Sequence, residues 1–551
     1  MKYILTLIMI ANTALSFSQT KYLFLVSFKD KSATEYSLSV PSDYLSAKAL
    51  ARRAKGNIGI DSLDLPIPQV CIDSVANRGF EIKCKVKWFN SVVVSTPDSS
   101  GIDALYNITF VKNIKFVGYN INGKSIAESK GLKTKNNSVS NQEFDYGDSY
   151  TQINMLGGDL LHDIGLKGDG ITIAVLDAGF NNANIIPQLS HLFDSNKIKA
   201  TWNFVDNTSE VYQVASGSHG TNVLSIIAAT ASGKIIGASP NANFLLLRTE
   251  DGSTEYIVEE YNWTAGAAFA DSAGADVINS SLGYTVFNDS NMNHKYSDMN
   301  GKTAPSSIAA TIAARKGILV CNSAGNEGGK VWRYVGAPAD ADSILTVGAV
   351  DASKMYASFS SIGPSYDKRL KPDVTAMGRS TITVTPGGDV TSGSGTSFSS
   401  PLIAGFSACL IQSHPEATNF EVMDAIKKSA SQYSNPDSLY GYGIPNFNFA
   451  NLILSNIIID KQNTTNLVNV YPNPFNDKID IIYFSLDTQS LKIELFDNKG
   501  ALVFSENKSI KQNSYNYWSL RNVEKCLAGV YFLKITEGNK NVITRKLIKN
   551  A

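Results

Sequence analysis

The sequence predicts an α/β protein built around a doubly wound, mainly parallel sheet, with a small α+β domain before it and a small β-sandwich after it. In the middle of the chain, short and almost uninterrupted apolar runs alternate with helical segments, as expected for strands buried on both faces. Near the C-terminus, apolar and polar residues alternate between Asn-Asp and Asn-Lys-Gly turns. The 551 residues also exceed what one hydrophobic core usually supports.

The first residues have the features of a secretory signal. Lys2 precedes an apolar stretch at 4–15, and the small residues Ser16 and Ser18 suit a signal-peptidase cut. We therefore expect residues 1–18 to be a signal peptide. A membrane-spanning helix needs about 20 apolar residues, which neither this segment nor any later one provides.

Residues 19–123 have the pattern of the small α+β domain. Strands are predicted at KYLFLVSF, EIKCKVKW, SVVVST and ITFVKNIKFV, and helices at LSAKALARR and PQVCIDSVANRG. The following segment, 124–149, is polar and rich in Ser, Asn and Lys. We expect it to be a linker that is open to proteolysis.

Residues 150–455 carry the pattern of the parallel sheet. Buried strands are predicted at ITIAVLD, NFLLLRT, DVINSSLG, GILVCNSAG and SILTVGAVD, and helices at NVLSIIAAT, TEYIVEEYNWTAGAAFADSAG and PSSIAATIAARKG. Sites in such sheets form at the carboxyl ends of the strands. A second linker at 456–465 leads to the predicted sandwich at 466–551.

Composition narrows the class of protein. Lys+Arg and Asp+Glu both number 49, and the resulting zero net charge gives no reason to expect a nucleic acid or a membrane surface as partner. The five cysteines are an odd number at irregular spacing, so we expect buried single thiols and no disulfide framework. Neither a CxxC nor an HExxH pattern occurs, and a zinc site is therefore not expected.

Three polar segments stand where the predicted fold forms sites. Asp177 closes the strand ITIAVLD, His219 lies on a Gly-flanked loop that opens a helix, and GTSFSSP (395–401) precedes a long apolar helix. Each has an ordinary structural explanation: an N-cap, a solvated histidine, and loop residues with Pro401 in the first helical turn. Together they point to a nucleophilic serine at a helix N-terminus, served by a histidine and a carboxylate.

The segments VLDAGF, HGTNV, NSAGNEG and GTSFSSP, in this order, resemble the motifs of the subtilisin-like serine proteases. The resemblance covers about 150–455. It implies the fold of that family and the roles of four residues: Asp177 as orienting carboxylate, His219 as general base, Asn326 as oxyanion donor and Ser397 as nucleophile. The implied reaction is peptide-bond hydrolysis through an acyl-enzyme intermediate.

The same resemblance implies a pocket for the first substrate side chain. Its two walls and its floor are expected at seven residues: Ser281, Leu282, Gly283, Ser323, Ala324, Gly325 and Gly336.

The chemistry gives each of the four residues a reason. An imidazole with an unperturbed pKa of about 6.5 accepts the Ser397 proton near neutral pH and returns it to the leaving amine. Asp177 holds the tautomer, while Asn326 and the Ser397 N–H bind the oxyanion. In a subtilisin, loss of one such donor costs roughly 3 kcal/mol.

Three positions depart from the usual family pattern. Ala178 stands where Ser or Thr is common, which removes one possible hydrogen bond to Asp177 that a backbone N–H or a water can replace. Asn222 replaces a frequent second histidine, and Phe398 replaces the usual methionine after Ser397. None of these changes removes a chemical role.

The flanking domains are similar to known partners of the subtilase domain. Residues 19–123 resemble the propeptide of exported subtilases, which assists folding and blocks the cleft until it is removed. The tail, with VYPNPF and GVYFLKITEGNKNVITRKLIK, is similar to the C-terminal sorting domains of type IX secretion in Bacteroidota. The resemblance implies export through the periplasm and the outer membrane by the secretion machinery, to the medium or the cell surface.

Other readings stay open at this point. One alternative is that the protein is a catalytically inactive subtilase fold used as a surface-displayed binding protein. Another is that the β-sandwich tail is an adhesin or another binding module. Glu250 and Asp251 lie at the implied substrate edge, where they either favour basic side chains or belong to a solvated loop. The expected chemistry needs no cofactor. Structural calcium stays open because no acidic loop has a diagnostic ligand spacing, and a monomer is expected.

Overall fold

The computed structural model describes residues 20–120, 144–460, 468–485, 490–509, 514–521, 523–537 and 541–550. The predicted signal peptide at 1–18 and most of the predicted linker at 124–149 lie outside these ranges. Within them, no helix is both long enough and apolar enough to span a membrane.

The centre of the molecule is a seven-stranded parallel sheet with the order β13-β12-β11-β10-β5-β9-β6. β5 lies between β9 and β10, so the connections diverge at its carboxyl end, as at the ligand sites of open α/β sheets. The strands are β5 (Thr172–Asp177), β6 (Ile198–Asn203), β9 (Asn243–Arg248), β10 (Val277–Ser280), β11 (Leu319–Ser323), β12 (Leu345–Val350) and β13 (Val374–Met377).

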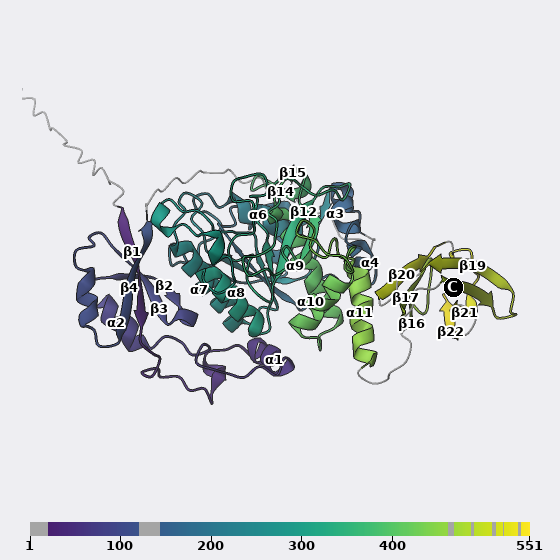
Figure 1. Cartoon of the computed structure of the whole chain (residues 1–551), viewed down its shortest axis with the longest axis horizontal. Helices are drawn as coiled ribbons and strands as arrows, with labels where there is room; N and C mark the ends of the chain where they lie inside the picture. The colour runs from purple at the N-terminus through teal and green to yellow at the C-terminus, as the bar shows by residue number, and fades with distance from the viewer. Residues whose placement is uncertain are drawn as a thin grey trace, which may run out of the picture.

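Helices cover both faces of this sheet, which confirms the doubly wound prediction (Figure 1). Along β5, Ile173 and Val175 pack into the core with α6 (Ser218–Ala228) and α9 (Thr396–Ser413). Ala174 and Leu176 face the opposite core, with α7 (Val258–Ala273) and α8 (Pro305–Arg315). Because both faces are buried, the strand is apolar at every position before Asp177 except Thr172.

Shorter elements complete the central domain. They are α3 (Tyr150–Asn154), α4 (Gly158–Asp163), α5 (Ser190–Asp194), α10 (Asn419–Lys428), α11 (Phe447–Asp460), β7 (Thr230–Ala231), β8 (Ile235–Ile236), β14 (Thr381–Val384) and β15 (Val390–Gly393). α11 runs into the segment 456–465 that was predicted to be a linker.

The N-terminal domain is a four-stranded antiparallel sheet with the order β2-β3-β1-β4 and the predicted α+β element order. Its elements are β1 (Lys21–Phe28), α1 (Ala47–Lys55), α2 (Gln69–Ala76), β2 (Glu81–Val86), β3 (Ser91–Thr96) and β4 (Val111–Asn120). On β1, Phe24 and Val26 pack with α2, whereas Leu23 and Leu25 pack into the core that contains α7. The central domain therefore buries the second face of this sheet.

Buried ion pairs join the two domains at α1. The Nη2 atom of Arg52 lies 2.5 Å from Oδ1 of Asp271 on α7. Arg53 Nη2 lies 2.7 Å from Asp271 Oδ2 and 2.6 Å from Asp64 Oδ1, and Lys316 Nζ lies 2.8 Å from Asp64 Oδ2. All five side chains are at least 96% buried, since none exceeds 4% exposure. The charges compensate one another at a dry interface.

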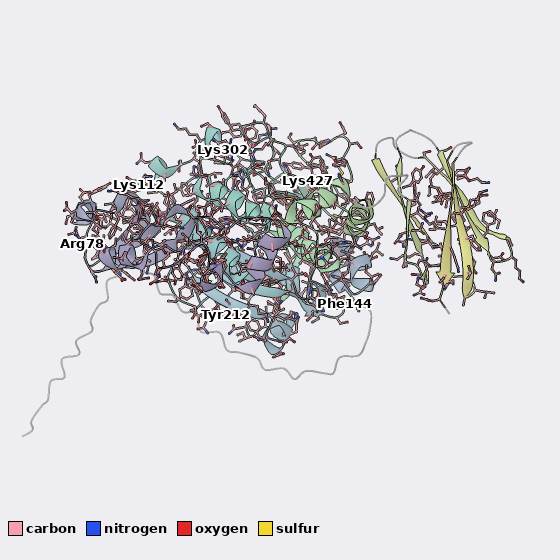
Figure 2. All side chains as sticks on the ribbon, turned by 90° about the horizontal axis from the view of Figure 1, so that it is seen from below. Arg78, Lys112, Phe144, Tyr212, Lys302 and Lys427 are labelled. Atoms are coloured by element: carbon pink, nitrogen blue, oxygen red, sulfur yellow. The ribbon has the colours of Figure 1, made fainter. Side chains whose placement is uncertain are left out.

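The C-terminal strands form the predicted antiparallel sandwich. One sheet holds β16 (Val468–Tyr471), β17 (Ile479–Ser485) and β20 (Ser514–Leu520); the other holds β18 (Ser490–Asp497), β19 (Leu502–Ser509), β21 (Gly529–Glu537) and β22 (Asn541–Lys549). Alternate apolar side chains of both sheets share one core. In Figure 2 side chains fill the space between the N-terminal and central domains, while the sandwich stands apart from both.

All five cysteines are free, and the four in the N-terminal and central domains are buried. Burial raises the pKa of the Cys84, Cys321 and Cys409 thiols, which keeps them protonated. The structure therefore agrees with the expectation of buried single thiols.

Candidate active site

Asp177 occupies the carboxyl end of β5, where the fold places its site. The side chain is fully buried, and its Oδ1 atom accepts hydrogen bonds from His219 Nδ1 and from the Ala178 N–H, both at 2.8 Å. Asp177 Oδ2 has no hydrogen-bond partner among the described residues, so no protein group takes the place of the hydroxyl that Ala178 lacks. Asp177 is held in place to orient His219.

His219 lies in the first turn of α6, and close packing brings that turn to Asp177. A Cβ atom on Gly220 would lie 2.2 Å from the carbonyl oxygen of Gly179 and 3.0 Å from Asp177 Cβ. No larger residue fits there, because real Cβ atoms do not approach backbone so closely. Glycine after the histidine is therefore what allows the Asp177–His219 contact.

Ser397 lies in the first turn of α9 and exchanges hydrogen bonds with Ser281. Its Oγ atom donates to the Ser281 carbonyl at 3.2 Å, and Ser281 Oγ donates to the Ser397 carbonyl at 2.9 Å. The sequence predicted a contact between Ser397 and His219. Among the hydrogen bonds of the described residues none joins these two side chains, so the hydroxyl has a different rotamer from the predicted one.

Pro401 explains why the Ser397 carbonyl accepts no hydrogen bond from its own helix. The sequence predicted Pro401 in the first turn of the helix, but α9 starts at Thr396 and Pro401 lies inside it. Proline has no N–H to donate to the carbonyl four residues earlier, which is that of Ser397. The Ser281 hydroxyl takes this acceptor instead, and the two segments are thereby joined.

Asn326 presents its amide beside the Ser397 backbone. Its Oδ1 atom accepts from the Thr396 N–H at 2.9 Å and from Thr396 Oγ1 at 3.1 Å, which leaves Nδ2 as the available donor. A Cβ atom built on Gly395 would lie 3.5 Å from this Nδ2 and 3.7 Å from the Ser397 nitrogen. The Asn326 amide and the Ser397 N–H therefore lie close to one point beside Gly395, where any other residue would place a side chain.

Thr396 is a site residue that the sequence reasoning missed. It orients Asn326, and its Oγ1 atom also accepts from the Gly325 N–H at 3.1 Å. The only signal in the sequence was one more hydroxyl in a segment already rich in them.

The structure brings the residues of the expected pocket together. Ser281 and Leu282 continue from β10 and Ser323 ends β11, which pairs with β10. The Tyr284 N–H donates to the Ala337 carbonyl at 2.7 Å, and a Cβ atom on Gly336 would lie 2.7 Å from Thr285. The segment 284–285, which follows the first wall, therefore lies against the chain around Gly336.

The surroundings of His219 change its proton affinity. Desolvation lowers its pKa, but the charge of Asp177, the hydrogen bond to Asp177 and the charge of Glu250 outweigh it and raise the pKa to about 9. The sequence predicted an unperturbed value, and a charge at Glu250 was not part of that prediction. Because the side chain is 37% exposed, water screens part of this field.

Phe398 takes the place of the usual methionine and packs beside the histidine. The two ring centroids lie 6.0 Å apart, and the Phe398 ring also fills the space that a Cβ atom on Gly393 would need. The residue that follows Ser397 therefore lies directly beside the His219 ring.

Comparison with protein families matches three parts of the chain. Residues 168–443 match the model of the subtilase family. The chain belongs to the subtilase family. In this subtilase, residues 23–136 match a peptidase S8 propeptide domain of Bacteroidota, and residues 469–550 match a secretion-system C-terminal sorting domain.

Curated relatives agree with the family. The chain is 31% identical to subtilisin NAT of Bacillus subtilis subsp. natto and 32% identical to subtilisin amylosacchariticus of Bacillus subtilis subsp. amylosacchariticus. Each alignment covers 53% of this chain and 69% of the relative. A subtilisin of Bacillus pumilus is 31% identical over 53% of this chain and 95% of its own length.

These matches establish the class of the protein. The subtilase is a serine endopeptidase made as a zymogen, and its sorting domain directs it through type IX secretion to the cell surface or the medium. Its fold is the α/β fold predicted from the sequence.

Proposed function

We propose that this subtilase cleaves peptide bonds with Ser397 as nucleophile, His219 as general base and Asp177 as orienting carboxylate. The proposal depends above all on the 2.8 Å hydrogen bond from His219 Nδ1 to the buried Asp177, which leaves Nε2 facing away from Asp177. Ser397 lies beside Phe398, whose ring neighbours His219. The proposal requires that rotation about the Cα–Cβ bond of Ser397 takes its hydroxyl from the Ser281 carbonyl to the histidine.

The proposed steps balance protons and bonds. Ser397 Oγ attacks the scissile carbonyl carbon while its proton passes to His219 Nε2. The oxygen that becomes negative accepts hydrogen bonds from Asn326 Nδ2 and the Ser397 N–H. The carbon–nitrogen bond then breaks as His219 returns the proton to the leaving amine, which gives the acyl-enzyme. Water repeats the sequence and restores Ser397.

Substrates and regulation follow from the same site. We infer that the substrates are proteins or peptides whose first side chain lies between segments 281–283 and 323–325. The N-terminal domain acts as the inhibitor until cleavage within 124–149, a segment whose composition supports processing. No cofactor enters these steps.

Active-site labelling tests the proposed function. A fluorophosphonate should label the processed wild-type enzyme at Ser397 and should not label Ser397→Ala, whose kcat should fall by about 10⁶-fold, as in a subtilisin that lacks its serine. Labelling of neither protein, together with intact folding by circular dichroism, would mean that the fold serves as an inactive binding protein.

A further inference from the structure

Three glutamates gather beside the proposed catalytic histidine. Glu250 and Glu255 lie on the loop between β9 and α7, and Glu259 is in the first turn of α7. One carboxylate oxygen of each lies within 4.8 Å of the other two. Basic side chains nearby form other ion pairs, since Arg248 pairs with Asp206 at 2.6 Å and His294 pairs with Glu260 at 2.7 Å. Lys83 lines a small cavity with Glu259 but pairs with Glu81 at 3.3 Å.

Two buried polar atoms at this cluster have no partner among the described residues. Glu259 is 1% exposed, and its Oε2 atom accepts no hydrogen bond. The Tyr284 side chain is fully buried, and its hydroxyl is also without a partner. Burial and then the charges of Glu250 and Glu259 raise the pKa of this phenol, which shows that it lies close to the carboxylates. Buried polar atoms in folded proteins usually have a partner, which is a protein group, an ordered water or a ligand.

The cluster borders the substrate cleft on two sides. On one side a Cβ atom on Gly252 would lie 2.8 Å from Ser216, in the loop that leads to His219. On the other side Tyr284 directly follows the pocket wall at 281–283, whose Ser281 is hydrogen-bonded to Ser397. A ligand of the cluster would therefore lie next to a peptide bound across Ser397.

The N-terminal domain reaches the same loop. The ring of Tyr119, near the end of β4, lies 5.6 Å from the ring of Tyr256, and a Cβ atom on Gly118 would lie 2.5 Å from the Tyr256 side chain. Asn120 and Glu259 line one small cavity. A polypeptide chain thus already approaches the cluster in the zymogen.

The donor set favours a lysine side chain over a metal ion. Calcium takes six to eight oxygen ligands, so at this cluster it would need both oxygens of each glutamate or added water. A lysine ammonium has three N–H donors, one for each carboxylate, and its aliphatic stem suits the apolar walls of a cleft.

We propose that Glu250, Glu255 and Glu259 form a subsite for a basic side chain of the peptide substrate, lysine above all, separate from the pocket for the first side chain. This inference rests on the proposed function, because it requires a substrate that is cleaved at Ser397. It selects between the two readings that the sequence left open for Glu250.

A positional peptide series tests the subsite. Fluorogenic peptides carry Lys, Arg or Gln in turn at each position on both sides of one scissile bond, and the processed enzyme is assayed at low and high salt. At one position we expect kcat/KM for Lys to exceed that for Gln by about 10- to 100-fold, with a smaller ratio at high salt. Glu250→Gln and Glu255→Gln should each reduce this ratio, which cancels any general change in activity.

Glu327→Gln is the matched control. Glu327 follows Asn326 and carries the same charge near the site, but it lies outside the cluster and pairs with Lys330 at 2.9 Å. This variant should keep the full Lys-to-Gln ratio. A similar decrease in all variants would indicate the general field of the cleft and overturn the subsite.

Two further results would overturn the proposal. One is a Lys-to-Gln ratio near one at every position in an enzyme that a fluorophosphonate still labels, an outcome that leaves the proposed function intact. The other is activity on the Gln peptides that depends on added Ca²⁺ and loses this dependence in Glu255→Gln, because the cluster would then be a metal site. Absence of labelling removes both proposals together.

Discussion

The two ends of α7 hold buried charge in opposite ways. Asp271, near the C-terminal end, is fully buried, and both Arg52 and Arg53 of the N-terminal domain neutralise it. Glu259, at the N-terminal end, is equally buried but meets Glu250 and Glu255 in place of a base. The helix dipole favours an acid at its N-terminus and opposes one at its C-terminus, so only Asp271 depends on arginines from another domain.

The ion pairs of Asp271 stabilise the contact between the two domains of the zymogen, whereas the glutamates around Glu259 form the proposed subsite. Burial works against the charged form of Arg53, but Asp271 and Asp64 outweigh it and raise its pKa. At the other end, burial and neighbouring carboxylates raise the pKa of Glu250 to about 8, that of Glu255 to about 7 and that of Glu259 well above 4.5. Each charge of the first set pairs with an opposite charge of the folded chain, whereas the described residues give the glutamates of the second set no ion pair.

Breaking the paired set should have the largest effect. In a Ser397→Ala chain, which cannot process itself, Asp271→Asn leaves two buried guanidinium groups without their shared carboxylate. We expect the free energy of unfolding to fall by about 3–5 kcal/mol. Denaturant unfolding followed through the fluorescence of the five tryptophans, which include Trp263 buried in α7, measures this change. A loss below about 1 kcal/mol would show that the arginines find other acceptors.

Removing one charge from the cluster of three glutamates should have the opposite effect and raise the free energy of unfolding. Because the folded pKa values of the glutamates are raised, their stability contribution is present below the unfolded value of about 4.5 and is lost as pH rises through the folded values. Glu259→Gln should therefore stabilise the protein by about 1–2 kcal/mol near pH 8 and by little near pH 4. Unfolding measured across this pH range checks the prediction, and destabilisation at every pH contradicts it.

Glu250 should also set the pH dependence of catalysis. The base form of His219 appears as pH rises through its pKa, so kcat/KM should rise with its half-point between the ordinary 6.5 and about 9. Glu250→Gln removes one of the charges that raise this pKa and should move the half-point down by up to about one unit. The pH profile for a neutral peptide measures the shift. An unchanged or upward half-point would show that Glu250 does not act on His219.

A surface pair gives the smallest expected effect and calibrates the others. Lys330 and Glu327 lie 2.9 Å apart, but the lysine is 65% exposed. Lys330→Gln should change the free energy of unfolding by about 0.5 kcal/mol or less, because water and salt already screen this pair. A change as large as that of Asp271→Asn would mean that burial does not account for the difference between the sets.

Much of the fold could be predicted because its signals are local. β1 spans the residues predicted for it, and the five predicted central strands all lie in the parallel sheet. β6 and β13 were not predicted, because both are edge strands of the sheet. β6 is only partly buried and mixes Lys199 and Thr201 with apolar residues, and β13 is four residues long. Edge strands lack the continuous apolar run that identifies a strand buried on both faces.

The sequence by itself determined the order of the domains and the types of the site residues. Apolar period and helix start signals depend on neighbouring residues, and the motifs around Asp177, His219, Asn326 and Ser397 are each contained within a few residues.

Only the tertiary structure decided how these residues affect one another. The rotamer of Ser397 depends on the carbonyl of Ser281, more than a hundred residues away in the chain. The proton affinity of His219 depends on Glu250, which lies near it because β9 pairs with β5 and Arg248 stands opposite Asp177. Hydrogen-bond partners and electric fields are set by distance in space, which no local pattern of the sequence records.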